Sequence, residues 1–188
     1  MNGLFLPPFC DGVIASHVLD VLRSDIFQVL EPFDPVLAGT FPIGLDLPYS
    51  DLDILCAFDD RTVFIELLTQ TFQHLPGWRL KQSMFQGHAS VVAGFSVEKV
   101  PVEIFGQTHT VWFQNAYRHM VVEYRLLALG GEHLKHQVLN LKTVGLSTEE
   151  AFAGVLELEG CPYQTLYDLS FLTCEELALR FEQFTANE

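Results

Sequence analysis

The chain has 188 residues, and its 10 Lys and Arg stand against 24 Asp and Glu, which gives a formal net charge of −14. Because 49% of the residues are hydrophobic and only 18% are charged, the composition excludes a disordered acidic tail. The negative charge argues against a generic nucleic-acid binder and against a polybasic membrane-surface protein, since both need a surplus of basic residues.

The first part of the chain predicts a helix and two strands. Apolar residues at helical spacing over 14–30 predict an amphipathic helix, which Pro32 ends. A short buried strand is expected over 36–38, followed by a loop over 39–50 that is rich in glycine and proline. Residues 51–58 alternate polar and apolar side chains and then become apolar, which predicts a strand with one end at solvent.

The middle of the chain predicts one helix and a meander. We expect Asp59 to cap a helix that covers about 60–74. Three further strands are separated by short turns, so they are expected to pair in antiparallel fashion. These strands are predicted over 78–85, 89–97 and 100–105.

The chain after residue 106 is expected to be helical. Helices over 112–129 and 133–144 are separated by Gly130 and Gly131. Three shorter helices follow, because two segments have capping-box spacing and one proline suits a first helical turn. The capping boxes begin at Ser147 and Thr173, and the proline is Pro162.

These elements predict an α/β (α+β) fold in two parts. Residues 1–106 would form a domain with a small mixed or antiparallel sheet and flanking helices. Residues 107–188 would form a helical region that packs on this domain and creates a cleft.

Two carboxylates stand at the start of the second predicted strand. Asp51 and Asp53 are two residues apart, so both side chains point to the same face, about 6.5–7 Å apart along the strand. Carboxylates this close repel each other and raise each other's pKa, and a bridging divalent ion removes that penalty. Oxygen-only ligands favour Mg²⁺ or Mn²⁺.

Upstream of these carboxylates, Gly39 and Thr40 offer backbone N–H groups on a tight turn and a hydroxyl, which is a suitable phosphate cradle. A phosphate cradle beside a metal pair predicts a site for a nucleoside triphosphate with its Mg²⁺.

The stretch over 39–54 resembles the signature of the polymerase-beta-like nucleotidyltransferase superfamily. In that signature a glycine and a small hydroxyl residue precede an Asp-apolar-Asp strand. The matching positions are Gly39, Gly44, Ser50, Asp51 and Asp53. Thr40 keeps the hydroxyl of the usual serine, whereas Ile43 replaces the usual arginine and so removes one positive charge.

The superfamily also has a third carboxylate on a later strand, and Glu103 matches it. The chain further resembles, over nearly its full length, a small bacterial family of unknown function within the superfamily. The segments that carry this likeness are 39–44, 103–107 and 114–120.

The resemblance implies metal-dependent transfer of a nucleoside monophosphate from a triphosphate to an acceptor hydroxyl. Asp51 and Asp53 would hold both metals, and Glu103 would hold the metal near the acceptor and deprotonate the attacking hydroxyl. The acidic composition favours a small molecule or a protein side chain over long DNA or RNA as the acceptor. The residues expected at the nucleotide's phosphates are Gly39, Thr40 and Ser50.

Basic residues gather in one segment. Residues 99–145 hold five basic and three acidic residues, a net charge of +2, whereas 146–188 hold nine acidic residues and one base, a net charge of −8. Arg118 and Arg125 lie on one helical face, and with Lys142 they are candidates for binding the triphosphate. The alternative is structural, with Arg118 at the surface and Arg125 paired with a nearby acid.

Other polar pairs favour structural roles. His119 and Glu123 are four residues apart, which predicts a structural pair rather than a catalytic dyad. His133 and His136 favour a solvated helix start over a metal pair, because no third ligand is evident. The apolar stripe at helical spacing is interpreted as ordinary core; it consists of Val121, Tyr124, Leu127 and Ala128.

An alternative function remains open at this point: a catalytically weak or inactive nucleotide-binding or interaction module, which includes the option of a partner of a toxin-like protein. The intact set of three carboxylates argues against it.

The chain is expected to be soluble and cytoplasmic, without a membrane contact. Residues 1–10 lack the basic start of a signal peptide, and no run of about 18 apolar residues occurs. The cysteines form no Cys-x-x-Cys pair and are predicted to be reduced and mostly buried. They are Cys10, Cys56, Cys161 and Cys174.

Overall fold

The computed structural model describes residues 25–85 and 87–185. Its internal contacts divide the chain into two compact units, Met1–Tyr117 and Arg118–Glu188. The division falls inside the first long helix after the sheet. Most of the helix expected over 14–30 lies outside the described residues, and its visible end is α2 (Ile26–Leu30), followed by the 3-10 turn η1 (Glu31–Phe33).

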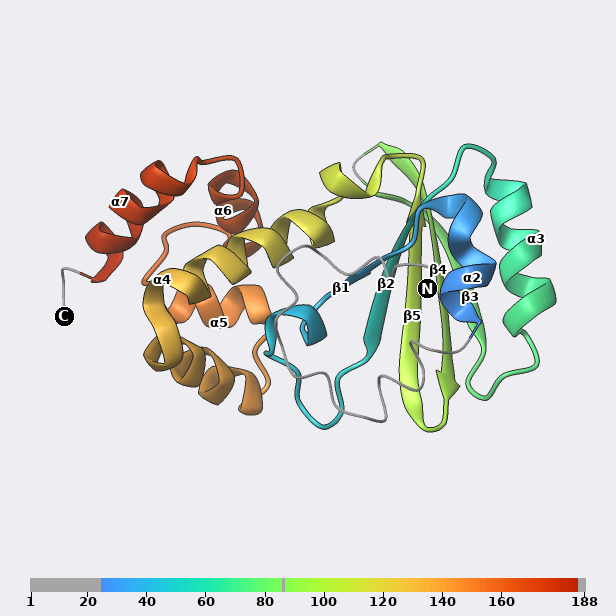
Figure 1. The fold of residues 1–188 in the computed structure, drawn as a ribbon, viewed down its shortest axis with the longest axis horizontal. Coiled ribbons are helices and arrows are strands. Elements are labelled where there is room, and N and C mark those ends of the chain that lie inside the picture. Colours follow the sequence, from blue (N-terminus) through green and yellow to red (C-terminus); the bar gives the residue numbers. More distant parts are fainter. Residues whose placement is uncertain (1–24, 86, 186–188) are drawn as a thin grey trace. The chain divides into compact units, whose positions relative to one another are not determined.

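The first unit is built on a mixed five-stranded sheet with the order β1-β2-β5-β4-β3 (Figure 1). β2 and β5 pair in parallel, and the other neighbouring strands pair in antiparallel fashion. The predicted meander of the last three strands is therefore confirmed. The strands are β1 (Val36–Ala38), β2 (Leu52–Ala57), β3 (Arg79–Phe85), β4 (His88–Val97) and β5 (Val100–Gln107).

Helices cover one face of this sheet. α2 and α3 (Arg61–Phe72) lie against it in Figure 1, and side chains such as Phe33, Phe64 and Ile54 form the buried core between the layers. Side chains alternate along a strand, so Asp53, next to the buried Ile54, points to the opposite face. The sheet thus has one face that builds the core and one that carries polar groups.

The cap of α3 corrects one prediction by a residue. Asp60, not Asp59, is the N-cap: its carboxylate accepts hydrogen bonds from the backbone N–H groups of Thr62 (2.7 Å) and Val63 (3.4 Å). Asp60 has the extended backbone of an N-cap, which aims its side chain at the free donors of the first turn.

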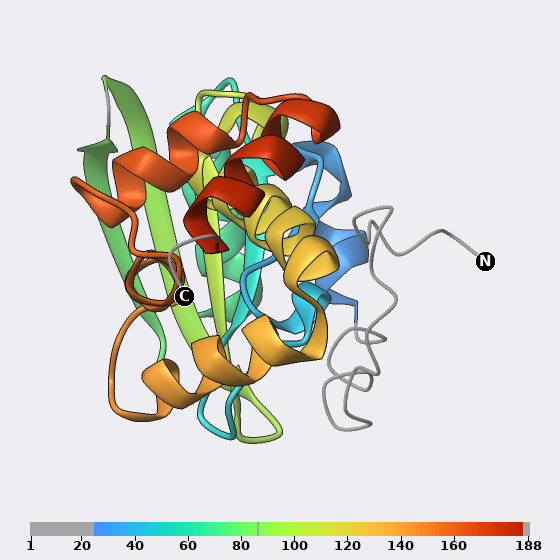
Figure 2. The same ribbon diagram turned by 90° about the vertical axis from the view of Figure 1, so that its left-hand side faces the viewer.

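The second unit consists of helices. After the 3-10 turn η3 (Val111–Phe113), α4 (Asn115–Thr143) crosses the boundary between the units. Two separate helices were predicted here, but residues on both sides of Gly131 are helical and Gly131 alone leaves the helical conformation (φ 60°, ψ −157°). The result is a bend rather than a loop, and Figure 2 shows the helix axis changing direction.

The three shorter helices begin at the predicted signals. α5 (Thr148–Val155) has a complete capping box, with Ser147 and Glu150 each accepting the other's backbone N–H. Pro162 opens α6 (Pro162–Leu169). Thr173 and Glu176 make the same reciprocal pair at the start of α7 (Cys174–Thr185).

Two burial predictions are wrong. Cys56 is buried, but Cys161 and Cys174 are exposed, because both lie at the starts of short surface helices. The buried face of α4 includes Met120, Val122 and Leu126. In the expected stripe, Val121, Tyr124 and Leu127 are only half-buried and Ala128 is exposed. None of the helices in the described part of the chain has the length and apolarity that a membrane span requires.

Candidate functional site

A row of residues at one register crosses the sheet and contains two of the three predicted carboxylates. Asp53 on β2 is the register partner of Glu103 on β5, and Glu103 is in turn the partner of Gly94 on β4. Ala38 on β1 and Arg79 on β3 complete the row at its two ends. Register partners point to the same face of a sheet, so Asp53 and Glu103 project together from adjacent strands, about 4.8 Å apart.

The carboxylate of Asp53 is seated against Gly39. A Cβ added at Gly39 would lie 2.0 Å from Oδ2 and 2.9 Å from Cγ of Asp53, so only a glycine leaves room for this carboxylate. Gly39 also has a φ of +70°, a left-handed conformation that other residues adopt at a cost. The predicted glycine and the predicted aspartate therefore form one local structure, created by the pairing of β1 with β2.

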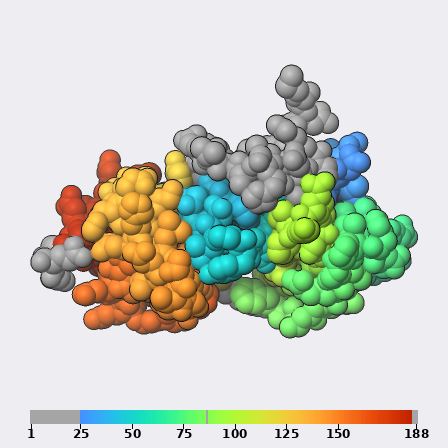
Figure 3. All heavy atoms as spheres, turned by 90° about the horizontal axis from the view of Figure 1, so that it is seen from below, coloured from blue at the N-terminus to red at the C-terminus, as the bar shows by residue number. Residues whose placement is uncertain are grey.

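The loop between β1 and β2 begins with a short 3-10 turn, η2 (Phe41–Ile43), for which Thr40 is the N-cap residue. The Thr40 carbonyl accepts a hydrogen bond from the N–H of Leu45 (3.0 Å). The hydroxyl of Ser50 accepts one from the N–H of Leu47 (2.9 Å). The structure thus gives Ser50 a role in closing the loop. Figure 3 shows this loop (cyan) beside the β4–β5 turn (yellow-green).

The side chains of the site carry the type of ligand atom that a hard divalent cation prefers. Asp53 and Glu103 are half-buried and share a register, Asp51 lies two residues before Asp53, and all three supply only carboxylate oxygens. One of these oxygens, Oδ2 of Asp53, occupies the space that a Cβ at Gly39 would fill. Within residues 25–85 and 87–185, however, the structure gathers no group of three or more His, Cys, Asp or Glu side chains as a metal site.

The partner of Glu103 in the structure is an arginine that sequence reasoning missed. A guanidinium nitrogen of Arg79 donates to Oε2 of Glu103 over 3.3 Å. The guanidinium lies over Gly94, because a Cβ there would be 2.2 Å from Cζ of Arg79. Arg79 and Glu103 are 24 residues apart in sequence, so only the antiparallel register of β3, β4 and β5 brings them together.

The three predicted basic residues belong to the helical unit, and each has a contact there. Arg125 donates to the carbonyl of Leu172 (2.8 Å), rather than pairing with an acid. Arg118 lies over the ring of Phe171, with Cζ 4.7 Å from its centroid. Lys142 is buried and donates to Thr148 Oγ1 (2.9 Å).

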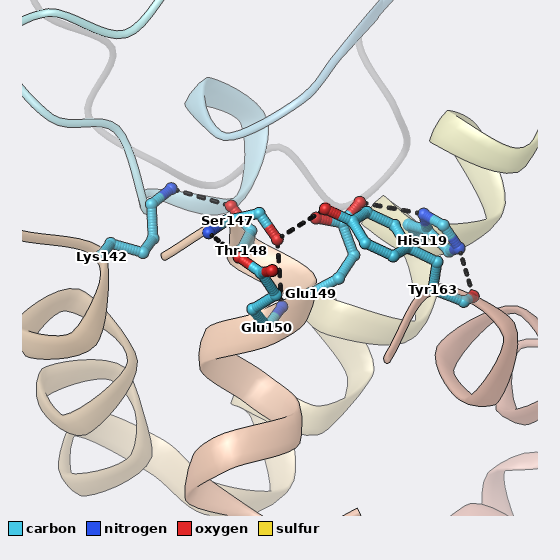
Figure 4. Close-up of polar contacts among 7 residues, drawn as sticks. All are labelled: His119, Lys142, Ser147, Thr148, Glu149, Glu150 and Tyr163. Atoms are coloured by element: carbon cyan, nitrogen blue, oxygen red, sulfur yellow. Dashed lines mark hydrogen bonds and ion pairs between the residues drawn. The ribbon is translucent and has the colours of Figure 1, made fainter. Parts of the chain in front are cut away.

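His119 is the centre of a polar cluster in this unit (Figure 4). Its Nε2 donates to the carbonyl of Tyr163 (2.9 Å), and its Nδ1 contacts Oε1 of Glu149 (3.0 Å). Both nitrogens are thus engaged by other groups, and the predicted pairing of His119 with Glu123 is wrong.

The two glutamates of this region have opposite pKa shifts. Burial alone would raise the pKa of Glu149, but its hydrogen bonds, above all the one to His119, outweigh this and lower the pKa. Glu123 is buried, and its Oε1 has no hydrogen-bond partner among the residues that the structure describes. Burial and the charge of Glu149 raise the pKa of Glu123 well above its ordinary value, against the opposing effect of Lys142.

The family model described as Domain of unknown function (DUF4269) matches residues 20–169 of the chain. No curated protein matches the chain.

Solved structures share the fold at low sequence identity. The Cid1 poly(U) polymerase with MgGTP bound is 19% identical, with a TM-score of 0.51 over 74% of this chain and 47% of that chain. The GLD-2/RNP-8 complex is 16% identical, with a TM-score of 0.52 over 92% of this chain and 76% of that chain. Cid1 with its short product ApU is 17% identical, with a TM-score of 0.50 over 92% and 66%.

The chain therefore spans about half the length of the Cid1 poly(U) polymerase that it matches. At these identities the likeness is one of fold. It confirms the prediction of a mixed α/β fold of the nucleotidyltransferase type, with a small sheet and flanking helices.

Proposed function

The chain belongs to the family Domain of unknown function (DUF4269), and we propose that it transfers a nucleoside monophosphate from a nucleoside triphosphate to an acceptor hydroxyl. The observation that carries this proposal is the shared register of Asp53 and Glu103, with the Asp53 carboxylate seated over Gly39. The fold likeness to Cid1, a poly(U) polymerase, supports the same class of reaction.

In the proposed reaction, the acceptor oxygen forms a bond to the α-phosphorus. The bond between that phosphorus and the bridging oxygen of the leaving group breaks, and pyrophosphate departs with the electron pair. The proton of the acceptor hydroxyl passes to a carboxylate, and we assign this role to Glu103, which is partly open to solvent. The turn at Gly39 and Thr40 would bind the β- and γ-phosphates through its N–H groups.

A divalent cation held by Asp51, Asp53 and Glu103 would supply positive charge for the phosphate oxygens. Mg²⁺ or Mn²⁺ suits this set of oxygen ligands. The contribution of the chain is to place the carboxylates on adjacent strands at one register, which needs no rearrangement of the sheet.

For the acceptor, we propose a small molecule or a protein side chain. A net charge of −14 opposes the approach of a long polyanion. The structures with the same fold act on RNA by their descriptions, as a poly(U) polymerase and an RNA terminal uridylyl transferase, so an RNA 3′ hydroxyl is the comparison that the assay must include.

Three observations favour the second candidate, a nucleotide-binding module without turnover. Glu103 is engaged by Arg79, and the part of the chain that the structure describes gathers no complete metal site. Ile43, at the position where the superfamily signature has an arginine, is buried and offers no charge to a phosphate.

The test is transfer of label from nucleoside triphosphates that are radiolabelled at the α-phosphate. The purified chain is incubated with Mn²⁺, each triphosphate in turn, and three acceptors: a short RNA, a cell extract of small molecules, and the protein itself. Pyrophosphate release and labelled product are both measured. Isothermal titration of the metal-triphosphate complex gives binding independently of turnover.

We expect Asp53→Asn and Glu103→Gln to reduce transfer by at least about 100-fold, as is usual for loss of a charged catalytic group. Asp59→Asn is the matched control, since it removes an exposed carboxylate just beyond the other end of β2. Metal-dependent binding without transfer would identify the nucleotide-binding module. Absence of both binding and transfer would reject the proposed function.

A further inference from the structure

We propose that Arg79 is the counter-ion that Glu103 exchanges for a divalent cation. The arginine holds this carboxylate while no cation is bound and releases it when one binds. The inference rests on the proposed function, because it takes Asp53 and Glu103 as the cation ligands. Arg79 is therefore a positioning residue, which acts through Glu103.

The geometry of the sheet creates this pair. Arg79 and Glu103 are on β3 and β5, with Gly94 of β4 between them at the same register. Because Gly94 has no side chain, the guanidinium lies in the space that a Cβ would occupy and reaches across to Glu103. Asp53 is on the other side of Glu103, on β2. Glu103 thus lies between the guanidinium of Arg79 and a second carboxylate.

The neighbouring row on the same face has a positive charge but neither the glycine nor the carboxylate. Lys81 is two residues after Arg79, so it points to the same face of the sheet. Its register partner on β4 is Val92, whose own partner on β5 is Phe105. Lys81 forms no ion pair with any residue that the structure describes. Of these two rows, only that of Arg79 combines a glycine on β4 with a carboxylate on β5.

The pair is weak enough to be exchanged. It consists of one nitrogen–oxygen contact of 3.3 Å, and the side chains are 62% and 33% exposed. A two-pronged arginine–carboxylate pair has contacts of about 2.7–2.9 Å. An exposed pair of this kind changes an equilibrium constant by at most about five-fold. A divalent cation shared by two carboxylates competes successfully with such a contact.

The test is isothermal titration calorimetry, in which Mn²⁺ is added to the full chain without nucleotide. We expect Arg79→Met to tighten Mn²⁺ binding by about five-fold, since the competitor of the cation is gone. Gly94→Ala keeps both charges but fills the space of the guanidinium, so it should tighten binding in the same direction. The matched control is Lys81→Met, which removes one positive charge from the same face of β3 and should change the affinity by less than about two-fold.

A double variant separates this exchange from general electrostatics. With Glu103→Gln already present, Arg79→Met should change Mn²⁺ affinity by less than about two-fold, as Lys81→Met does, because the interaction energy belongs to the pair. Thermal unfolding of each variant verifies that it is folded. An effect of Arg79→Met that equals that of Lys81→Met, or that persists beside Glu103→Gln, would overturn the inference.

The same titration distinguishes this failure from failure of the proposed function. If the wild-type chain binds Mn²⁺ and Asp53→Asn weakens binding, but Arg79→Met leaves it unchanged, only the exchange is wrong. If neither the wild type nor Arg79→Met binds Mn²⁺, the cation site and the exchange are both rejected. Binding by Arg79→Met with little binding by the wild type would support the exchange.

Discussion

Substitution of Gly39 by alanine tests whether this glycine positions the Asp53 carboxylate. The φ of +70° makes the backbone strained for alanine, which costs about 1–2 kcal/mol. The new Cβ would lie 2.0 Å from Oδ2 of Asp53, so the carboxylate must leave its position. A side chain forced away from its preferred rotamer costs about 1 kcal/mol more. The free energy of unfolding should fall by about 2–3 kcal/mol, which lowers Tm by about 5–10 °C in a chain of this size.

Gly87→Ala is the control for backbone strain alone. Gly87 has a φ of +80°, and a Cβ there would meet nothing within 4 Å. Both variants share the strain and the reduced freedom of the unfolded chain. Gly87→Ala should therefore lower Tm by about 3–6 °C and leave Mn²⁺ affinity unchanged.

The assay is thermal unfolding together with Mn²⁺ titration of both variants. Because the proposed cation site depends on the position of the Asp53 carboxylate, Gly39→Ala should weaken Mn²⁺ binding by about ten-fold or more. Equal Tm shifts in the two variants, with unchanged Mn²⁺ affinity in Gly39→Ala, would refute the reasoning that Gly39 positions Asp53.

The remaining predictions concern the helical unit. The raised pKa of Glu123 means that the folded state keeps the proton of this carboxyl, while the unfolded state loses it above about pH 4.5. The folded state is therefore destabilised as the pH rises. Glu123→Gln should raise Tm at pH 8 and make the decrease in Tm between pH 5 and pH 8 smaller. A steeper decline in the variant would contradict this. Glu149 has a lowered pKa, so its contribution is present above its ordinary pKa and lost as pH falls through the lowered value. Glu149→Gln should therefore cost about 2 kcal/mol at pH 7 and progressively less as the pH falls below the ordinary pKa of a glutamate. Denaturant unfolding measures this cost, and a pH-independent cost would disprove the reasoning. Ser147→Ala removes the N-cap acceptor of α5 and the partner of the Tyr163 hydroxyl; we expect a loss of about 1 kcal/mol by the same method, and no loss would show that the cap is replaced by water.

Local features could be predicted from the sequence where neighbours along the chain supply the interaction. The capping boxes at Ser147 and Thr173 and the start of α6 at Pro162 occur as predicted, because each depends on residues within one helical turn. Of the two aspartates expected on one strand, Asp53 lies on β2, whereas Asp51 precedes its first residue, Leu52. Errors of one residue, such as the cap at Asp60, come from competing acids next to each other.

Interactions across elements could not be predicted in the same way. His119 has Glu123 four residues away, but it binds Glu149, which is 30 residues away. Helical spacing makes a contact available, and the packing of α5 and α6 against α4 decides which partner forms it. The buried side of α4 was misjudged for the same reason: the neighbouring elements, and not the apolar stripe, determine which face is covered.

The candidate site also has features that the sequence predicts and features that depend on contacts across elements. The sequence by itself determined which residue types are present: a glycine and a hydroxyl in a turn, two carboxylates two residues apart, and a later acid flanked by apolar residues. Only the tertiary structure decided that Glu103 shares a register with Asp53, that Gly39 lies under the Asp53 carboxylate, and that Arg79 reaches Glu103 across Gly94. Strand order and register arise from burial of the whole apolar face of the sheet, and no short stretch of sequence contains that information.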